Sequence, residues 1–128
     1  MKTFAIAEEH QGLTDIDVVD RFNPERDQPM FNDIKKVLEK HGALSRFGVT
    51  LLHKHFDIYE GERLVEFCDH ENRTLTLRPI SESPGPNQTH VATNWRFDTG
   101  SAVVNQRCFA ECLTTQGVHT SEVHKKKP

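Results

Sequence analysis

One change in hydrophobic period, near residue 42, constrains the fold more than any other feature of the sequence. Before it, three apolar residues recur at the spacings of three and four that mark one face of a helix: Phe31, Ile34 and Leu38. Pro29 suits the first turn of such a helix, and Gly42 suits its left-handed end. The pattern predicts a helix over residues 30–41, preceded by a polar loop over residues 20–29 and a possible short strand at the N-terminus.

After the helix the period becomes two, which is typical of β-strands. Residues 46–56 would place five side chains on one face: Phe47, Val49, Leu51, His53 and His55. The opposite face carries Lys54 and is also mainly apolar, as in a central strand. This alternation predicts that the two histidines project from the same side of a strand.

Further strands follow. Glu62–Cys68 and Arg73–Pro79 flank a polar stretch of four residues, which predicts an antiparallel hairpin. Residues 81–87 read as a turn-rich loop.

His90–Asp98 alternates again, with Val91, Thr93, Trp95 and Phe97 as the expected core face. His90, Ala92, Asn94 and Arg96 form its expected polar face. Residues 101–113 fit either a strand or a helix, and we favour a strand that ends near Cys108.

These elements predict an α+β fold, in which an N-terminal helix packs on a mainly antiparallel sheet or a small β-barrel. A chain of 128 residues and 14.7 kDa fits a single domain, 1–128, with a polar tail over about 114–128.

Charge and composition limit the classes of partner that we expect for this chain. The net charge of −3 lacks the basic excess typical of nucleic-acid-binding domains, so we expect no nucleic acid partner. No apolar run is long enough to cross a bilayer, and the N-terminus lacks the apolar core of a secretory signal, so we expect a soluble, cytoplasmic protein and no membrane partner. The odd number of cysteines, Cys68, Cys108 and Cys112, predicts free thiols in such a compartment.

Eight histidines make metal binding a hypothesis. On a strand, His53 and His55 would lie about 7 Å apart at Cα, close enough to share one metal ion. A metal site needs further ligands, for which the candidates are Glu60, Glu62, Cys68, His70 and His90.

Two stretches resemble the two motifs of the cupin family. The first motif, a glycine before His-x-His and then a glutamate, is matched by Gly48, His53, His55 and Glu60. The second motif, a Pro/Gly turn before a histidine with asparagine four residues later, is matched by residues 84–86, His90 and Asn94. The resemblance covers residues 46–98.

This resemblance implies a small cupin-like β-barrel in which His53, His55, Glu60 and His90 hold Fe, Mn, Ni or Zn. Glu62 is an alternative carboxylate ligand. The metal would act as a Lewis acid or a dioxygen-binding centre on a small organic acid, as in cupin dioxygenases and isomerases. Arg96, beside Asn94, would clamp the acid through its bidentate fork.

Other readings of the same residues remain open. The histidines can be ordinary half-buried side chains of a non-catalytic ligand-binding or protein-interaction module. One strand histidine can be the axial ligand of a haem. Cys68 can act as a nucleophile only if a histidine lies beside it. The sequence does not choose between an enzyme and a binding protein, and it leaves the oligomeric state open.

Overall fold

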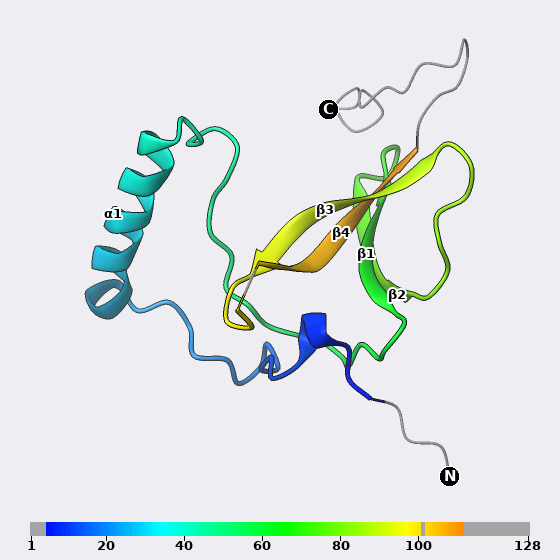
Figure 1. Ribbon diagram of the computed structural model, residues 1–128, viewed down its shortest axis with the longest axis horizontal. Helices are drawn as coiled ribbons and strands as arrows, with labels where there is room; N and C mark the ends of the chain where they lie inside the picture. Colours follow the sequence, from blue (N-terminus) through cyan, green and yellow to red (C-terminus); the bar gives the residue numbers. More distant parts are fainter. Residues whose placement is uncertain (1–4, 101, 112–128) are drawn as a thin grey trace. The chain divides into compact units, whose positions relative to one another are not determined.

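The computed structural model describes residues 5–100 and 102–111, and the predicted polar tail lies outside this range. The elements are a short 3-10 helix η1 (Glu8–His10), one α-helix α1 (Pro24–Lys40) and four strands, β1 (Arg63–Asp69), β2 (Thr74–Ile80), β3 (Gln88–Arg96) and β4 (Val103–Glu111) (Figure 1). The chain divides into two compact units. The helix unit is Leu13–His55, and the sheet unit joins the segment up to Gly12 to the chain from Phe56 onward.

In the helix unit, α1 begins earlier than its apolar stripe predicts. Asn23 is the N-cap, because its side chain accepts hydrogen bonds from the backbone N–H groups of Glu25 and Arg26 at 3.0 and 3.3 Å. Pro24 then occupies the first helical position, where its missing N–H costs nothing. The predicted loop over residues 20–29 is therefore wrong from Pro24 onward, and Pro29 lies inside the helix.

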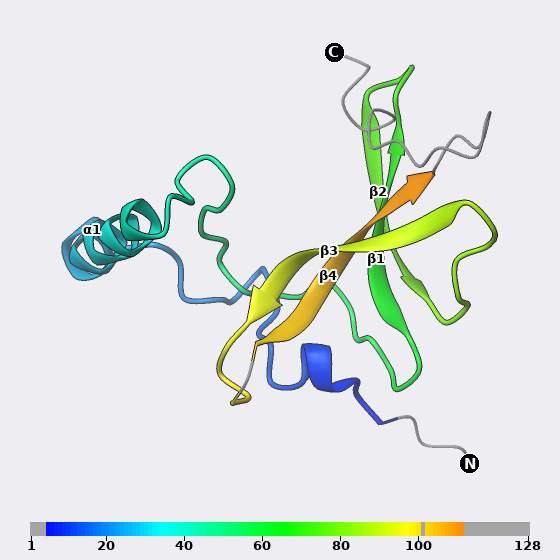
Figure 2. The ribbon, with the colours of Figure 1, turned by 45° about the horizontal axis from the view of Figure 1, so that its top comes forward.

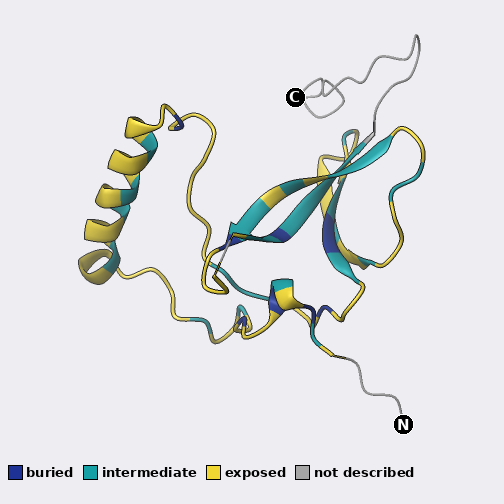
Figure 3. Cartoon of the chain, viewed as in Figure 1, coloured by how far each residue is buried: buried dark blue, intermediate teal, exposed yellow. Residues whose placement is uncertain are grey.

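The C-terminal end of α1 agrees with the prediction. Gly42 adopts a φ of 64° and donates its N–H to the carbonyl of Glu39 at 3.0 Å. Ala43 donates to the carbonyl of Leu38 at 2.8 Å, which completes the closing turn. None of the helix residues is buried, and the stripe residues Phe31, Ile34 and Leu38 are half-buried (Figure 3).

The strand predicted over residues 46–56 is wrong. In this stretch only Lys54 pairs in a β-bridge, and its partner is Asp15. The Lys54 N–H donates to Thr14, and the Lys54 carbonyl accepts from Ile16, both at 2.9 Å. Alternation produces a strand only where a partner backbone satisfies the ladder, and within the helix unit the described partner is this one short segment.

The sheet unit contains a mixed four-stranded sheet in the order β2-β1-β4-β3 (Figure 2). The hairpin β1–β2 is antiparallel, as predicted, and so is β3–β4. β1 and β4 are parallel. The α+β class is confirmed, and so is the strand rather than the helix at the end of the described chain. In the described residues β2 and β3 do not pair, so the sheet is not closed into a barrel.

One end of the sheet carries a small apolar core. Ala7, Ile58 and Leu64 are buried together, with Leu77 packed against them, and Val65 is fully buried. The N-terminal segment reaches this core as a bridge between Ile6 and Tyr59 rather than as a strand. Among the described helices, none has the length and apolarity needed to span a bilayer.

Burial along His90–Asp98 largely reverses the prediction, although Trp95 of the expected core face is half-buried. Val91 and Phe97, expected in the core, are 44% and 73% exposed, whereas Arg96 is only 3% exposed. Two causes act together. The pairing of β3 with β4 shifts register at Asn94, and Arg96 finds enough hydrogen-bond acceptors to be buried.

Candidate functional site

The four residues of the expected metal site fall in different units. His53 and His55 belong to the helix unit, and Glu60 and His90 belong to the sheet unit. The two imidazoles are neighbours, since their ring centroids are 5.0 Å apart in an edge-on arrangement. His53 Nδ1 lies 2.6 Å from the carbonyl oxygen of Leu51. The described residues contain no group of three or more histidine, cysteine or acidic side chains that could hold a metal ion.

Glu60 and Glu62 both belong to the turn that precedes β1. Glu60 is exposed, and its backbone N–H donates to the carbonyl of Ala5 at 2.8 Å. The Glu62 carboxylate accepts a hydrogen bond from the backbone N–H of Tyr59 at 2.9 Å. Gly61 supplies the positive φ of 86° that the turn requires. In this structure Glu62 closes the turn, and Glu60 faces solvent.

Arg96, expected to bind a substrate, makes internal contacts with its guanidinium group. It donates two hydrogen bonds to the Asp98 carboxylate, each at 2.7 Å, and it also donates to the backbone carbonyls of Glu9 and Gln11 at 3.3 and 2.8 Å. Asp98 raises the pKa of Arg96, and Arg96 lowers the pKa of Asp98. Asn94 pairs with Gln106 at the register shift of β3. Arg96 thus ties the end of β3 to η1.

A different group of residues gathers on one face of the sheet. Phe67 and Phe109 meet across the parallel β1–β4 pair, with ring centroids 5.0 Å apart. His90 pairs with Phe109 in register, and its ring lies 6.2 Å away. On the other side, the Arg78 guanidinium lies 4.3 Å from the centre of the Phe67 ring. We call this row the cross-strand stack: Arg78, Phe67, Phe109 and His90, one side chain from each strand.

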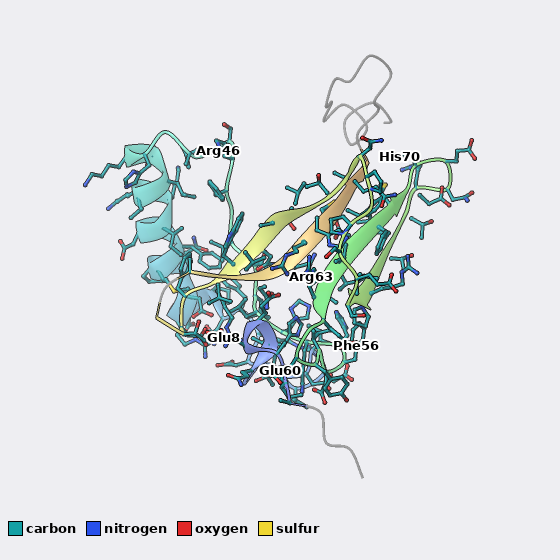
Figure 4. The ribbon with its side chains drawn as sticks, turned by 45° about the vertical axis from the view of Figure 1, so that its right-hand side comes forward. Glu8, Arg46, Phe56, Glu60, Arg63 and His70 are labelled. Carbon is teal, nitrogen blue, oxygen red and sulfur yellow. The ribbon has the colours of Figure 1, made fainter. Side chains whose placement is uncertain are left out.

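Two more arginines flank the cross-strand stack on the same face. Val65 pairs with Arg78 on one side and with Arg107 on the other, and Arg63 lies two residues before it on β1. Paired residues and residues two apart share a face of the sheet, so these side chains stand beside the stack. Figure 4 shows Arg63 and His70 at opposite ends of β1.

The arginines differ in their partners. Arg107 forms two hydrogen bonds with the Glu9 carboxylate at 2.8 and 2.9 Å, and both side chains are about one-fifth exposed. Asn105 donates to the Glu9 carbonyl at 2.8 Å, which holds η1 over β4. Arg63 and Arg78 have no carboxylate within ion-pair distance among the described residues. With Asp69 also on this face, three arginines stand against two carboxylates among the described residues, and the net charge is positive.

His90 stays neutral at neutral pH within this basic surrounding. Burial lowers its pKa below the usual 6.5, and the nearby charges of Arg63 and Arg107 lower it further. Its Nδ1 atom is buried without a hydrogen-bond partner among the described residues. The ring thus contributes a neutral, planar end to the cross-strand stack on β3.

The opposite face of the sheet places a histidine beside Cys68, which sequence reasoning could not show. Cys68 is exposed, and its Sγ lies 3.7 Å from His70 Nδ1. Burial raises the pKa of the Cys108 thiol, and the neighbouring Glu66 and Cys68 raise it further. Cys68 is a free thiol, as predicted, and Cys112 lies outside the described residues.

Sequence reasoning missed the cross-strand stack as a unit. The available signal was the period-two pattern of Arg63, Val65 and Phe67 in one strand, repeated by Arg107 and Phe109 in another. Sequence does not tell that these strands are adjacent and parallel, because a β1–β4 pairing joins segments about forty residues apart.

Comparison of the chain with protein-family models, with curated proteins and with solved structures finds no match. The cupin resemblance therefore stays a prediction, and the functional proposal below rests on the geometry of the chain itself.

Proposed function

We propose that this chain is a ligand-binding module whose sheet face, the one that bears the cross-strand stack, takes a small anionic molecule. The observation that carries the proposal is a pair of arginines on neighbouring strands of one face, Arg63 and Arg78, for which the described residues offer no carboxylate partner. An unpaired guanidinium presents a planar fork of donors that suits phosphate or carboxylate oxygens.

The surroundings prepare these arginines for binding. The Phe67 ring lies beneath the Arg78 guanidinium and limits its freedom, so less conformational entropy is lost when an anion binds. Arg107 is held in place by Glu9, which compensates one of the three positive charges on this face. The remaining positive potential attracts anions to the face and weakens as salt is added.

Titration of the protein with tripolyphosphate, followed by calorimetry, tests this proposal. We expect saturable binding that weakens as the salt concentration rises, and that falls at least tenfold in Arg63→Gln and in Arg78→Gln. Arg46→Gln is the matched control, because Arg46 also lies over a phenylalanine ring, that of Phe47, at 5.0 Å, but in the helix unit. Equal loss in Arg46→Gln, or no binding by the unaltered chain, would contradict the proposal.

A second candidate is a divalent-metal site at the histidine pair. The contact of His53 Nδ1 with the Leu51 carbonyl supports it, because a donated proton there leaves Nε2 with a free lone pair. We expect His53→Ala and His55→Ala each to weaken Zn²⁺ or Ni²⁺ binding, and His70→Ala to leave it unchanged.

Metal content measured alongside circular dichroism on the same samples separates loss of ligands from loss of folding. Full metal binding by the double variant His53→Ala/His55→Ala would rule this site out.

A further inference from the structure

The cross-strand stack indicates what kind of anion the sheet face accepts, and this inference rests on the function proposed above. We infer that the ligand is a nucleotide, in which a phosphate group binds Arg63 and Arg78 while a planar heteroaromatic base packs against the stack. The same chemistry occurs in a free nucleotide and in a single-stranded nucleic acid, and the experiment below distinguishes the two sources.

The first reason is the continuity of the planar groups. Contacts of 4.3, 5.0 and 6.2 Å link Arg78, Phe67, Phe109 and His90 across all four strands. A site for a simple anion needs donors but no aromatic row. Base rings stack favourably on aromatic side chains, and they also stack on guanidinium planes.

The second reason is the exposure of Arg78. Its guanidinium contacts the Phe67 ring on one side, and the residue as a whole is exposed, so a further planar ring can pack against it. Phe67, Phe109 and His90 are half-buried rather than fully covered. The stack therefore lies next to two guanidinium groups that have no carboxylate partner in the described part of the chain, and its Arg78 end is exposed.

The third reason is the local charge, which differs from that of the whole chain. The net charge of −3 led us to expect no nucleic acid partner. On this face, however, Arg63, Arg78 and Arg107 stand against the single partner carboxylate of Glu9. Asp69 follows Phe67 on the same face and stays ionised, so three arginines stand against two described carboxylates and a net positive charge remains. Positive charge and planar groups thus coincide here.

The test compares tripolyphosphate, adenosine triphosphate and a single-stranded DNA of twelve nucleotides in calorimetric titrations of the full chain. The proposal expects adenosine triphosphate to bind at least tenfold more tightly than tripolyphosphate, because only the nucleotide carries a base. A single strand that binds a further tenfold more tightly identifies the single strand as the source, and one that binds no more tightly than adenosine triphosphate identifies a free nucleotide.

Arg78→Lys keeps the charge but removes the planar group, and its exposed position makes a folding defect easy to exclude by circular dichroism. We expect this variant, and Phe67→Leu, to lose the preference for the nucleotide while binding tripolyphosphate within about twofold of the unaltered chain. Arg46→Lys, the matched control, should keep the preference.

The two levels of the proposal can fail separately. If tripolyphosphate binds but adenosine triphosphate and the single strand bind no more tightly, the nucleotide inference is overturned and the anion-binding function stands. If none of the three binds, the anion-binding function is overturned as well. If both Arg78→Lys and Phe67→Leu keep the preference for the nucleotide, the base does not bind at the cross-strand stack, and the inference is overturned.

Discussion

At the residue scale, the buried arginine of β3 is the clearest case of a polar side chain that the fold uses internally. Arg96 is 3% exposed, yet four hydrogen bonds to Asp98, Glu9 and Gln11 satisfy it. A buried charge is tolerated only when it is paired and hydrogen-bonded in this way. The Arg96 guanidinium, which the sequence predicted to bind an acidic substrate, therefore links β3 to η1 instead.

We expect Arg96→Met to lower the free energy of unfolding by about 3 kcal/mol, because it removes the four hydrogen bonds by which the buried guanidinium holds Asp98 and the backbone carbonyls of Glu9 and Gln11. Urea denaturation followed by tryptophan fluorescence measures this change. Arg73→Met, at an exposed position in the hairpin turn, is the control and should change stability by less than about 0.5 kcal/mol. An effect of Arg96→Met as small as that of the control would contradict the internal role.

The lowered pKa of His90 makes the free energy of unfolding depend on pH. Its pKa is lowered in the folded chain by burial and by Arg63 and Arg107, whereas in the unfolded chain it stays near 6.5. Just below pH 6.5 the unfolded state binds more protons than the folded state, so the stability contributed by neutral His90 is present above pH 6.5 and is lost as pH falls through the folded-state pKa.

We therefore expect the free energy of unfolding to decrease between pH 7.5 and pH 5.5, and to decrease less in His90→Phe. The carboxyl groups of Asp69 and Asp98, whose pKa values are lowered from 3.8, do not interfere in this pH window. Urea denaturation at the two pH values measures the difference. The same pH dependence in the variant would assign it to another group.

At the element scale, α1 shows how a capping signal outweighs an apolar stripe. The stripe alone starts the helix at residue 30, but Asn23 and Pro24 start it at Pro24. Asn23 also donates its backbone N–H to the Asp27 carboxylate at 2.9 Å, so the first turn is capped reciprocally. Pro29 removes one helical hydrogen bond in the second turn, and the cap offsets part of that cost.

We expect Asn23→Ala to lower helix stability by about 1 kcal/mol, since it removes the acceptor for the N–H groups of Glu25 and Arg26. Far-UV circular dichroism during thermal unfolding measures the loss. Asn23→Ser should retain most of the stability because serine also caps helices, and Asn32→Ala, on the exposed surface further along α1, is the control. A loss no larger than that of Asn32→Ala would contradict the cap.

At the scale of the whole molecule, burial is unevenly divided between the two units. In the described part of the helix unit only Leu13 and Ala43 are buried, and α1 contributes no buried residue. The sheet unit holds Val65 at 0% exposure and the core around Ile58 and Leu64. Eight large apolar side chains of the helix unit are exposed: Val18, Phe22, Met30, Val37, Leu44, Phe47, Val49 and Leu51.

Segments with few buried contacts open at a lower free energy than segments in a core. We expect the amides of α1 to exchange with deuterium at least tenfold faster than those of β1 and β4. Hydrogen exchange followed by mass spectrometry measures both units in one sample. Equal protection of α1 and the central strands would show that the two units open as one.

What the sequence determined by itself is local. Interactions within a few residues determine three features of the fold. The positive φ of Gly42 ends α1, and the polar turn sets the β1–β2 hairpin. Local alternation makes β3 and β4 extended. The free thiol of Cys68 also agrees with its prediction. The α+β class follows from these elements.

Only the tertiary structure decided which segments pair and which side chains meet. Residues 46–56 alternate like a strand, but no strand forms because a ladder requires a partner backbone. Arg96, expected on the polar face of β3, is buried because it donates hydrogen bonds to the backbone carbonyls of Glu9 and Gln11, which are far away in sequence. The cross-strand stack exists because β4 lies parallel to β1 and brings Phe109 beside Phe67, and such long-range pairing depends on the packing of the whole sheet rather than on local pattern.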